Sequence, residues 1–246
     1  MTTLKNKVAI VTGSSKGIGA QIAILLAEAG AKTVINYAND DAAANEIVDK
    51  IKAAGGEAIA VQADVSDTKQ VKAMFDTTIS ELGQPDILVN SAGIIICKTI
   101  EETTDEDFDR IFSTNVKGTF NTLREAATKL NDGGRVINLS STTTRMMLPT
   151  YGSYCATKGA VEQLTRIFAK EVGARKITVN AVSPGPTDTD LFHQGKADET
   201  IEQLASTSAF NRIGEPIDIA RVVLFLAGEE AAWVTGQNIG ANGGVA

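Results

Sequence analysis

The stretch that decides the fold is Lys7-Val-Ala-Ile-Val-Thr12-Gly13-Ser-Ser-Lys16-Gly17-Ile-Gly19, near the start of the chain. Its first half is a short apolar run, typical of a buried parallel strand. A glycine-containing loop follows, and residues 20–29, closed by Gly30, have a helical pattern. Glycines let the backbone approach a pyrophosphate, and a helix N-terminus offers free N–H groups and partial positive charge. The order strand, glycine loop, helix therefore predicts a dinucleotide site, although a tight structural turn would use the same residues.

Strand and helix patterns alternate along the rest of the chain. Helical patterns at 42–54, from 66, at 104–130, through 169 and at 216–226 separate further apolar runs at 33–37, 57–61, 85–89, 135–140, 177–182 and 234–240. This alternation predicts an α/β fold: a doubly wound parallel sheet (Rossmann fold) of about seven strands flanked by helices. We expect residues 1–246 to form a single domain, in which a polar segment at about 187–212 without clear periodicity serves as a substrate lid.

Charge and composition exclude several classes of partner. The 246 residues carry a net charge of −7 without a basic block, which argues against nucleic acid and anionic membranes. No apolar run approaches the ~18 residues of a membrane span. The two cysteines, Cys97 and Cys155, are too far apart in sequence to suggest a disulfide framework, so we expect a cytoplasmic protein without a metal site. Cys155 adjoins Tyr154, but a packing thiol is favoured over a nucleophile because no His-type base lies nearby in sequence.

Tyr154 and Lys158 lie four residues apart at the start of a predicted helix, which places both side chains on one face. A free phenol has a pKa of about 10, and a neighbouring positive charge lowers that pKa toward neutrality. Ser141 follows the apolar run at 135–140, where a hydroxyl at the carboxyl end of a strand can point into a crevice. Taken alone, a Tyr–Lys pair at this spacing is usually a surface pair.

The loop spacing G-x-x-x-G-x-G, with Thr12 before it and Tyr154-x-x-x-Lys158 later, resembles the short-chain dehydrogenase/reductase family over essentially the whole chain. The resemblance implies reversible hydride transfer between a nicotinamide cofactor and a ketone or secondary alcohol. It assigns Tyr154 as the general acid/base and Lys158 as the group that lowers its pKa and binds the nicotinamide ribose. Ser141 would polarise the carbonyl.

The resemblance also separates close rivals. The family places the serine thirteen residues before the tyrosine, which selects Ser141 over Ser140, and Tyr151 has no lysine four residues after it. In Asn115-Val-Lys-Gly118, the pattern N-x-x-G implies that Asn115 kinks its helix and holds a relay water through its backbone carbonyl. A buried asparagine of purely structural use is the alternative.

The cofactor residues implied by the resemblance follow the carboxyl ends of successive strands. The Asp64-Val65 pair would contact adenine, Asn90-Ser-Ala-Gly93 matches the family's N-N-A-G except at Ser91, and 184–189 matches its P-G-x-x-x-T loop. The expected set is Gly13, Ser15, Lys16, Gly17, Ile18, Gly19, Asn36, Asp64, Val65, Asn90, Ala92, Gly93, Tyr154, Lys158, Pro184, Gly185, Thr187 and Thr189.

Two residues bear on the choice between NADP(H) and NAD(H). An acidic residue at the end of the second strand would accept from a ribose 2′-OH and repel a 2′-phosphate, but this chain has Asn36. Lys16 stands where related NADP enzymes often carry a basic residue. Both favour NADP(H), with NAD(H) still possible.

The substrate is expected to be a small-molecule ketone or alcohol. Enoyl reductases of this fold have a longer Tyr–Lys separation, so the spacing of Tyr154 and Lys158 favours C=O over C=C reduction. The pocket walls are expected on 94–97, 142–151 and the lid at 190–210, where His193 is either a proton relay or an exposed residue. The predicted substrate contacts are Ser141, Ile94, Thr143, Met147, Tyr154 and Phe192.

A stand-alone carbonyl reductase is the leading prediction. The alternative is a 3-oxoacyl-thioester reductase, but the segment 131–134 lacks the basic docking residues that carrier-protein-using members have there, although Arg175 could still contribute. A non-catalytic dinucleotide sensor is the alternative of another class, disfavoured because all four acid/base residues are present. The resemblance also implies a homotetramer built through the helix containing Asn115 and the helix that follows Tyr154.

Overall fold

The computed structural model describes residues 2–194 and 196–246, with a seven-stranded parallel sheet at its centre. The strands lie in the order β3-β2-β1-β4-β5-β6-β7, which confirms the predicted doubly wound fold. Their bounds are β1 Val8–Thr12, β2 Lys32–Tyr37, β3 Glu57–Gln62, β4 Ile87–Asn90, β5 Arg135–Leu139, β6 Thr178–Pro184 and β7 Asn238–Ala241.

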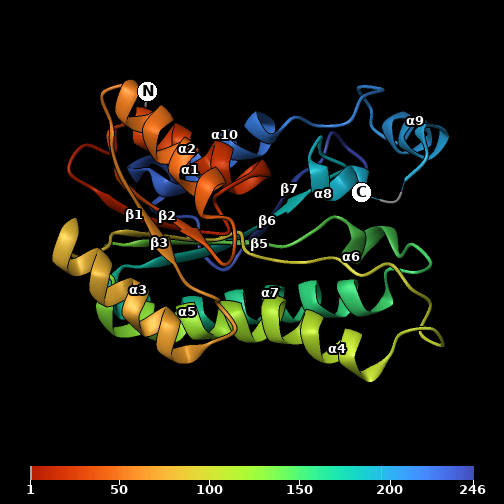
Figure 1. The fold of residues 1–246 in the computed structure, drawn as a ribbon, viewed down its shortest axis with the longest axis horizontal. Coiled ribbons are helices and arrows are strands. Elements are labelled where there is room, and N and C mark those ends of the chain that lie inside the picture. Colours follow the sequence, from red (N-terminus) through yellow and green to blue (C-terminus); the bar gives the residue numbers. More distant parts are fainter. Residues whose placement is uncertain (1, 195) are drawn as a thin grey trace.

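Helices cover both faces of the sheet (Figure 1). On one side α1 (Gly17–Glu28), α2 (Asp41–Ala53) and α10 (Pro216–Ala227) pack over an apolar core that includes Ile22 and Val223. On the other side lie α3 (Thr68–Glu81), α4 (Asp105–Phe112), α5 (Gly118–Lys129) and α7 (Gly152–Glu171), over a second core that includes Phe75. Because both faces are covered, β1, β4 and β5 are buried along their whole length, which explains why apolar residues make up most of each strand.

The strand order reverses between β1 and β4, because the chain first proceeds outward through β2 and β3 and then returns. In open α/β sheets a ligand crevice forms at this point, beyond the carboxyl ends of the strands. The glycine loop after β1 and the segments after β4, β5 and β6 all leave the sheet at this edge. The fold therefore brings together motifs that are far apart in sequence.

The segment predicted as one or two helices over 104–130 is two helices joined by a π-helical turn, η1 (Ser113–Lys117). The helix after the glycine loop begins at Gly17, earlier than the expected Ala20. Short elements not separated by the sequence patterns are α6 (Thr143–Met146), η2 (Gly173–Arg175) and η3 (Glu229–Ala231).

The segment predicted to be a substrate lid is more regular than its polar sequence suggested. It contains α8 (Asp190–His193) and α9 (Asp198–Ser206), and the Thr189 hydroxyl caps α8 by accepting the N–H of Phe192 at 3.2 Å. Gly195, inside the predicted lid, lies outside the described residues. Throughout 2–194 and 196–246, no helix has both the length and the apolar character needed to cross a membrane. Within the same ranges, no group of three or more His, Cys, Asp or Glu side chains is placed to hold a metal ion.

Candidate active site

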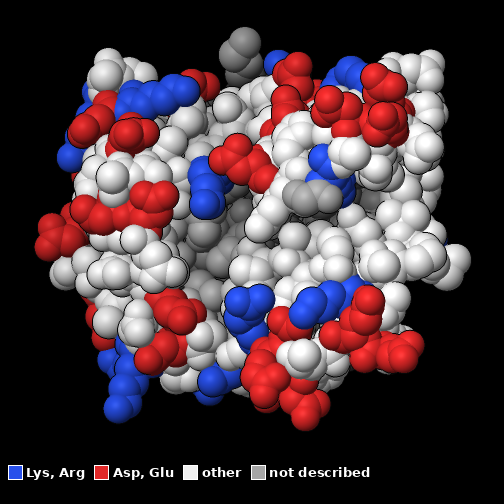
Figure 2. All heavy atoms as spheres, turned by 45° about the vertical axis from the view of Figure 1, so that its right-hand side comes forward, with Lys and Arg blue, Asp and Glu red and all other residues white. Residues whose placement is uncertain are grey.

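A cavity of about 460 Å³ lies at the carboxyl edge of the sheet, between the glycine loop, α7 and the lid. Figure 2 shows a face of the molecule hollowed near its centre, with basic and acidic side chains around the hollow. The sequence-predicted residues that line the cavity are Gly13, Ser15, Lys16, Gly17, Ile18, Gly19, Ala92, Gly93, Ile94, Ser141, Thr143, Tyr154, Lys158, Pro184, Gly185, Thr187, Thr189 and Phe192.

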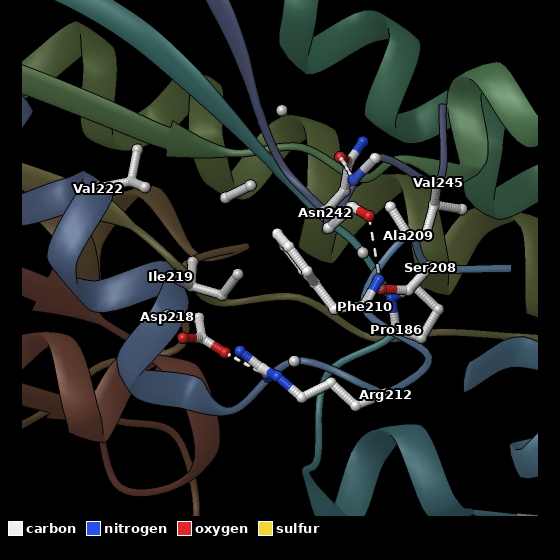
Figure 3. Close-up of a pocket in the computed structure, with 16 residues that line it drawn as sticks. Pro186, Ser208, Ala209, Phe210, Arg212, Asp218, Ile219, Val222, Asn242 and Val245 are labelled. Atoms are coloured by element: carbon white, nitrogen blue, oxygen red, sulfur yellow. Dashed lines mark hydrogen bonds and ion pairs between the residues drawn. The ribbon is translucent and has the colours of Figure 1, made fainter. Parts of the chain in front are cut away.

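A second cavity of about 430 Å³ lies between α10 and the C-terminal segment (Figure 3). Arg212 and Asp218 form an ion pair in its wall at 2.8 Å. It shares only Gly185 and Pro186 with the first cavity, and none of the four predicted catalytic residues lines it. The first cavity is therefore the candidate active site.

The glycine loop is shaped by two glycines, and a side chain at either position would force neighbouring backbone atoms to move. Gly13 has φ +60°, and a Cβ there would come within 2.7 Å of the Ala92 Cα. A Cβ on Gly19 would lie 2.4 Å from the Gly13 carbonyl oxygen. The start of α1 is thus held directly against the loop and the end of β4. This leaves a backbone cradle at a helix N-terminus, the arrangement that suits a pyrophosphate.

The structure corrects the role predicted for Asn36. Its side chain does not line the cavity but is buried beneath the glycine loop. Its Oδ1 accepts the Gly13 N–H at 3.1 Å, and its Nδ2 donates to the carbonyls of Val61 and Ala63 at 3.2 and 3.0 Å. Asn36 therefore shapes the loop rather than facing a ribose. The missed residues at this end of the cavity are Tyr37 and Ala38, which follow in the sequence and do line it.

Three other expected cofactor residues also lie outside the cavity lining. The Asp64 carboxylate accepts the Ser66 N–H at 2.9 Å in a local turn, and Val65 packs against Gly118 on α5. Asn90 is buried and donates to the Asn138 side chain at 2.8 Å. In each case the side chain is used to pack or join elements beneath the site.

Burial dominates the electrostatics of Tyr154 and Lys158. Desolvation raises the pKa of Tyr154 to about 12, partly offset by the hydrogen bond with Ser141. Desolvation lowers the pKa of Lys158 to about 8. The Lys158 ammonium lies 5.7 Å from the Tyr154 ring centroid and donates to the Leu139 carbonyl at 2.8 Å. The expected lowering of the Tyr154 pKa by Lys158 is therefore not found, because burial raises that pKa and the Ser141 hydrogen bond alone lowers it.

The Ser141 hydroxyl is oriented by its neighbour Thr143. Its oxygen accepts both the Thr143 N–H at 3.2 Å and the Thr143 hydroxyl at 2.8 Å. These two donors occupy the lone pairs of Ser141, so its own proton is left to donate, either to the Tyr154 phenol oxygen or to a group bound in the cavity. The rival Ser140 also borders the cavity, but its hydroxyl donates to the Glu162 carboxylate at 2.8 Å.

Asn115 lies in the π-helical turn and is 1% exposed. Its side chain pairs with Ile94 in both directions, accepting the N–H at 2.8 Å and donating to the carbonyl at 2.9 Å. Its own carbonyl accepts the Thr119 hydroxyl at 2.9 Å. A Cβ on Gly93 would lie 3.3 Å from the Asn115 Oδ1 and 3.6 Å from the Lys158 Nζ, so the three residues adjoin. The interruption of the helix agrees with the expected kink.

The part of the cavity predicted to bind the substrate has apolar walls. Met147, predicted as a contact, is 80% exposed and does not line the cavity. The backbone of Met147 has φ +53°, which turns the chain there and leaves its neighbours in the wall instead. The apolar residues lining this end are Ile94, Ile95, Met146, Leu148, Tyr151, Leu191, Phe192 and Leu204.

Two polar lid residues take different positions. Lys196, which the sequence patterns did not single out, lines the cavity and donates to the Phe192 carbonyl at 2.5 Å. His193 does not line the cavity, and its Nε2 lies 2.6 Å from the Asp188 carboxylate. The interpretation of His193 as an exposed residue is thus favoured over a proton relay.

Comparisons with known proteins cover nearly the whole chain. The family model described as Enoyl-(Acyl carrier protein) reductase matches residues 13–246. A probable tetrahydroxynaphthalene reductase from Zymoseptoria tritici is 44% identical over 98% of this chain and 94% of the relative. The NADPH-dependent aldehyde reductase-like chloroplastic protein of Arabidopsis thaliana is 49% identical over 98% of this chain and 94% of its own length.

Solved structures agree with this assignment. An angucycline C-6 ketoreductase, LanV, with bound NADP superposes with a TM-score of 0.94 at 40% identity, covering 99% of this chain and 97% of that one. A dehydrogenase/reductase from Sinorhizobium meliloti superposes with a TM-score of 0.95 at 40% identity, over 99% and 96% of the two chains. Together with the glycine loop, the seven-stranded sheet and the Ser141–Tyr154–Lys158 cluster, these matches place the chain in the short-chain dehydrogenase/reductase family.

Proposed function

We propose that this protein is an NADP(H)-dependent carbonyl reductase that converts an apolar ketone to a secondary alcohol. The observation that carries the proposal is the convergence of Ser141, Tyr154 and Lys158 in the wall of one cavity that also contains the glycine loop. Relatives whose names describe ketone or aldehyde reduction, one of them with bound NADP, support the same chemistry.

The residues of the cavity fit a dinucleotide. The loop from Gly13 to Gly19 presents backbone at the start of α1, and Lys16 places a positive charge there. Lys16, Lys158 and Lys196 all line the cavity, against one carboxylate from Asp190. This local excess of positive charge, in a chain of net charge −7, suits a cofactor that carries several phosphates. When bound, the reduced nicotinamide supplies the hydride.

Tyr154 would supply the proton. Its pKa of about 12 keeps the phenol protonated at neutral pH, as a proton donor for reduction requires. Ser141, with both lone pairs engaged by Thr143, would donate its hydrogen bond to the substrate carbonyl oxygen. Lys158 would hold positive charge behind the phenol, and Asn115 would fix the segment at Gly93 and Ile94 that borders it.

The choice of bond reduced rests on the Tyr154–Lys158 spacing. Their separation of four residues favours C=O reduction, although the matching family model bears the name of enoyl reductases. The apolar wall formed by Met146, Leu148 and Leu204 favours a substrate with an apolar body beside its carbonyl. A 3-oxoacyl thioester is the second candidate, since an acyl chain would also fit such a wall.

The test is oxidation of NADPH and of NADH, followed at 340 nm, with aryl and aliphatic ketones, a 3-oxoacyl thioester and an enoyl thioester. We expect turnover of free ketones with NADPH. The Tyr154→Phe variant should bind NADPH as tightly as the wild type and lose turnover. Preference for either thioester would replace the carbonyl reductase assignment, and retained turnover in Tyr154→Phe would reject the assigned mechanism. NADPH binding without turnover of any substrate would favour the sensor alternative.

We also propose that the protein is a homotetramer. The helices expected at the interface, α4, α5 and α7, expose Phe108, Phe120 and Ile167 by 46%, 47% and 59%. Large apolar side chains gathered on adjacent helices are typical of a protein interface. Light scattering after size-exclusion chromatography should give four times the chain mass of 25.8 kDa, and a monomer would reject the proposal.

A further inference from the structure

Helix α7 holds the end of β5 through a series of side chains on one face. Thr165 receives the Asn138 side-chain amide at 2.8 Å, and Lys158 donates to the Leu139 carbonyl at 2.8 Å. Residues 158, 162 and 165 follow helical spacing, so they share a face of α7. Each of these contacts ties the helix that carries Tyr154 to the strand that leads to Ser141.

Glu162 is the acidic residue of this series, and its hydrogen bonds go to the loop after β5 rather than to the strand. Its Oε1 accepts the Ser140 hydroxyl at 2.8 Å and the Thr144 hydroxyl at 3.0 Å. These two donors lie on either side of Ser141 in the sequence. Thr144 Oγ1 also lies 3.0 Å from the carbonyl oxygen of Ser141 itself, so its single proton is shared between that carbonyl and the Glu162 carboxylate.

The other side of the same loop is held by different groups. The Thr142 hydroxyl donates to the Ser183 carbonyl at 3.2 Å and accepts from the Asn242 side chain at 3.2 Å. Those bonds fasten the loop to β6 and to the segment after β7. Glu162 provides two side-chain bonds that fasten the loop to α7, the helix that bears Tyr154 and Lys158. The Cys155 thiol of the same helix adds a weaker one, to the Thr143 carbonyl at 3.3 Å.

We propose that Glu162 is a positioning residue that sets the distance between the Ser141 hydroxyl and the Tyr154 phenol by holding Ser140 and Thr144. This inference rests on the proposed reductase function. A carboxylate accepts charge-assisted hydrogen bonds, which are stronger and more directional than neutral ones. Catalytic groups displaced by about 1 Å can lose roughly 100-fold in rate, so a clamp on both sides of Ser141 has a direct catalytic consequence.

The test begins with Glu162→Ala, assayed with a ketone that the wild type reduces. We expect kcat to fall about 10- to 100-fold, while the Kd for NADPH, measured by fluorescence, stays within about twofold. Glu162→Gln should recover most of the activity, because its amide oxygen still accepts a hydroxyl proton. Glu171→Ala, at the exposed end of the same helix, is the matched control and should keep wild-type kcat.

A double-mutant cycle separates positioning from general loss of structure. If Glu162 acts through Ser141, adding Glu162→Ala to Ser141→Ala should cause little further loss. The inference would be overturned if the fold-losses in kcat of the two single variants multiply in the double variant, or if Glu162→Ala keeps wild-type kcat. Should Glu162→Ala fail to fold, the pair Ser140→Ala and Thr144→Val removes the same two donors, and unchanged kcat in that double variant would equally overturn it. Absence of ketone reduction in the wild type would instead reject the proposed function.

Discussion

The side chain of Asn36 receives the backbone N–H of Gly13 at 3.1 Å, so the end of β2 directly holds the first glycine of the cofactor loop. A second hydrogen bond runs in the other direction, because the Asn36 N–H donates to the Ser14 hydroxyl at 3.0 Å. The residue predicted to face the ribose is therefore a structural support of the glycine loop. An acidic substitution at this position should therefore act on stability before it acts on cofactor choice.

We predict that Asn36→Asp destabilises the protein without creating NADH preference. The carboxylate would face the Val61 and Ala63 carbonyls, which now accept from the Asn36 amide. Burying an unpaired charge against two acceptors costs about 3 kcal/mol or more. Urea unfolding should show this loss, while exposed Asn39→Asp should change the free energy of unfolding by less than about 0.5 kcal/mol. A stable Asn36→Asp enzyme that prefers NADH would contradict the assignment.

Cofactor choice should instead respond at Ala38, which lines the cavity just beyond β2. A carboxylate in Ala38→Asp would repel a ribose 2′-phosphate and could accept from a 2′-OH. We expect kcat/KM for NADPH to fall about 10- to 100-fold, as the loss of about 1.4 to 2.8 kcal/mol implies, with little change for NADH. The neutral Ala38→Asn is the isosteric control, and an equal loss with it would point to steric exclusion instead of charge.

Lys16 should also contribute to the preference for NADPH over NADH, because its positive charge attracts the 2′-phosphate that a carboxylate would repel. Lys16→Ala removes a cation from the cavity wall, so NADPH should bind more weakly while NADH binding changes less. The loss of NADPH affinity should be smaller at high ionic strength, because salt screens the attraction between the exposed Lys16 ammonium and the cofactor phosphate. Titration of both cofactors at low and high salt measures this. Equal weakening of both cofactors would place Lys16 at the pyrophosphate.

The neighbouring methionines provide a matched pair for the substrate wall. Met146 lines the cavity, whereas Met147 is 80% exposed. Met146→Ala should raise KM for an apolar ketone by about 10-fold, since it removes apolar contact area worth roughly 1.5 kcal/mol. Met147→Ala should leave KM unchanged. A larger effect at Met147 would mean that the turn between Met146 and Leu148 is rearranged when substrate binds.

The fold was predictable because buried parallel strands have mostly apolar sequences, and a helical pattern separates each apolar run from the next. The glycine loop and the cluster of Ser141, Tyr154 and Lys158 were predictable from spacing. Their meeting in one cavity follows from topology, since parallel strands end at the same edge of the sheet.

The direction of individual side chains was harder to predict. Asn36 and Asn90 follow the expected positions, yet their side chains turn into the protein, where backbone carbonyls and Asn138 need partners. Met147 is predicted to contact the substrate, but its left-handed backbone leaves Met146 and Leu148 in the cavity wall instead. The two helices of the segment predicted as a lid are short and bury no residue, and α8 begins at the Thr189 cap rather than at an apolar pattern. These features depend on tertiary contacts that a linear pattern does not contain.

The pH dependence should differ between the two directions of the reaction. Burial raises the pKa of Tyr154 to about 12, so the phenol stays protonated and able to donate across pH 6–9. Burial lowers the pKa of Lys158 to about 8, so its positive charge is lost as the pH rises through that value. Reduction, which needs both the phenol and the charge, should therefore decline above about pH 8. Alcohol oxidation needs phenolate and should rise with pH over the same range.

The variant Lys158→Arg tests which group causes the decline in reduction. A guanidinium keeps its charge up to a pKa above about 12, so the decline near pH 8 should disappear even if the absolute rate is lower. Profiles of kcat/KM for ketone reduction at constant ionic strength, wild type beside variant, provide the measurement. If the decline persists in Lys158→Arg, Lys158 is not its cause, and Tyr154 itself must titrate well below its pKa of about 12 once substrate and cofactor are bound.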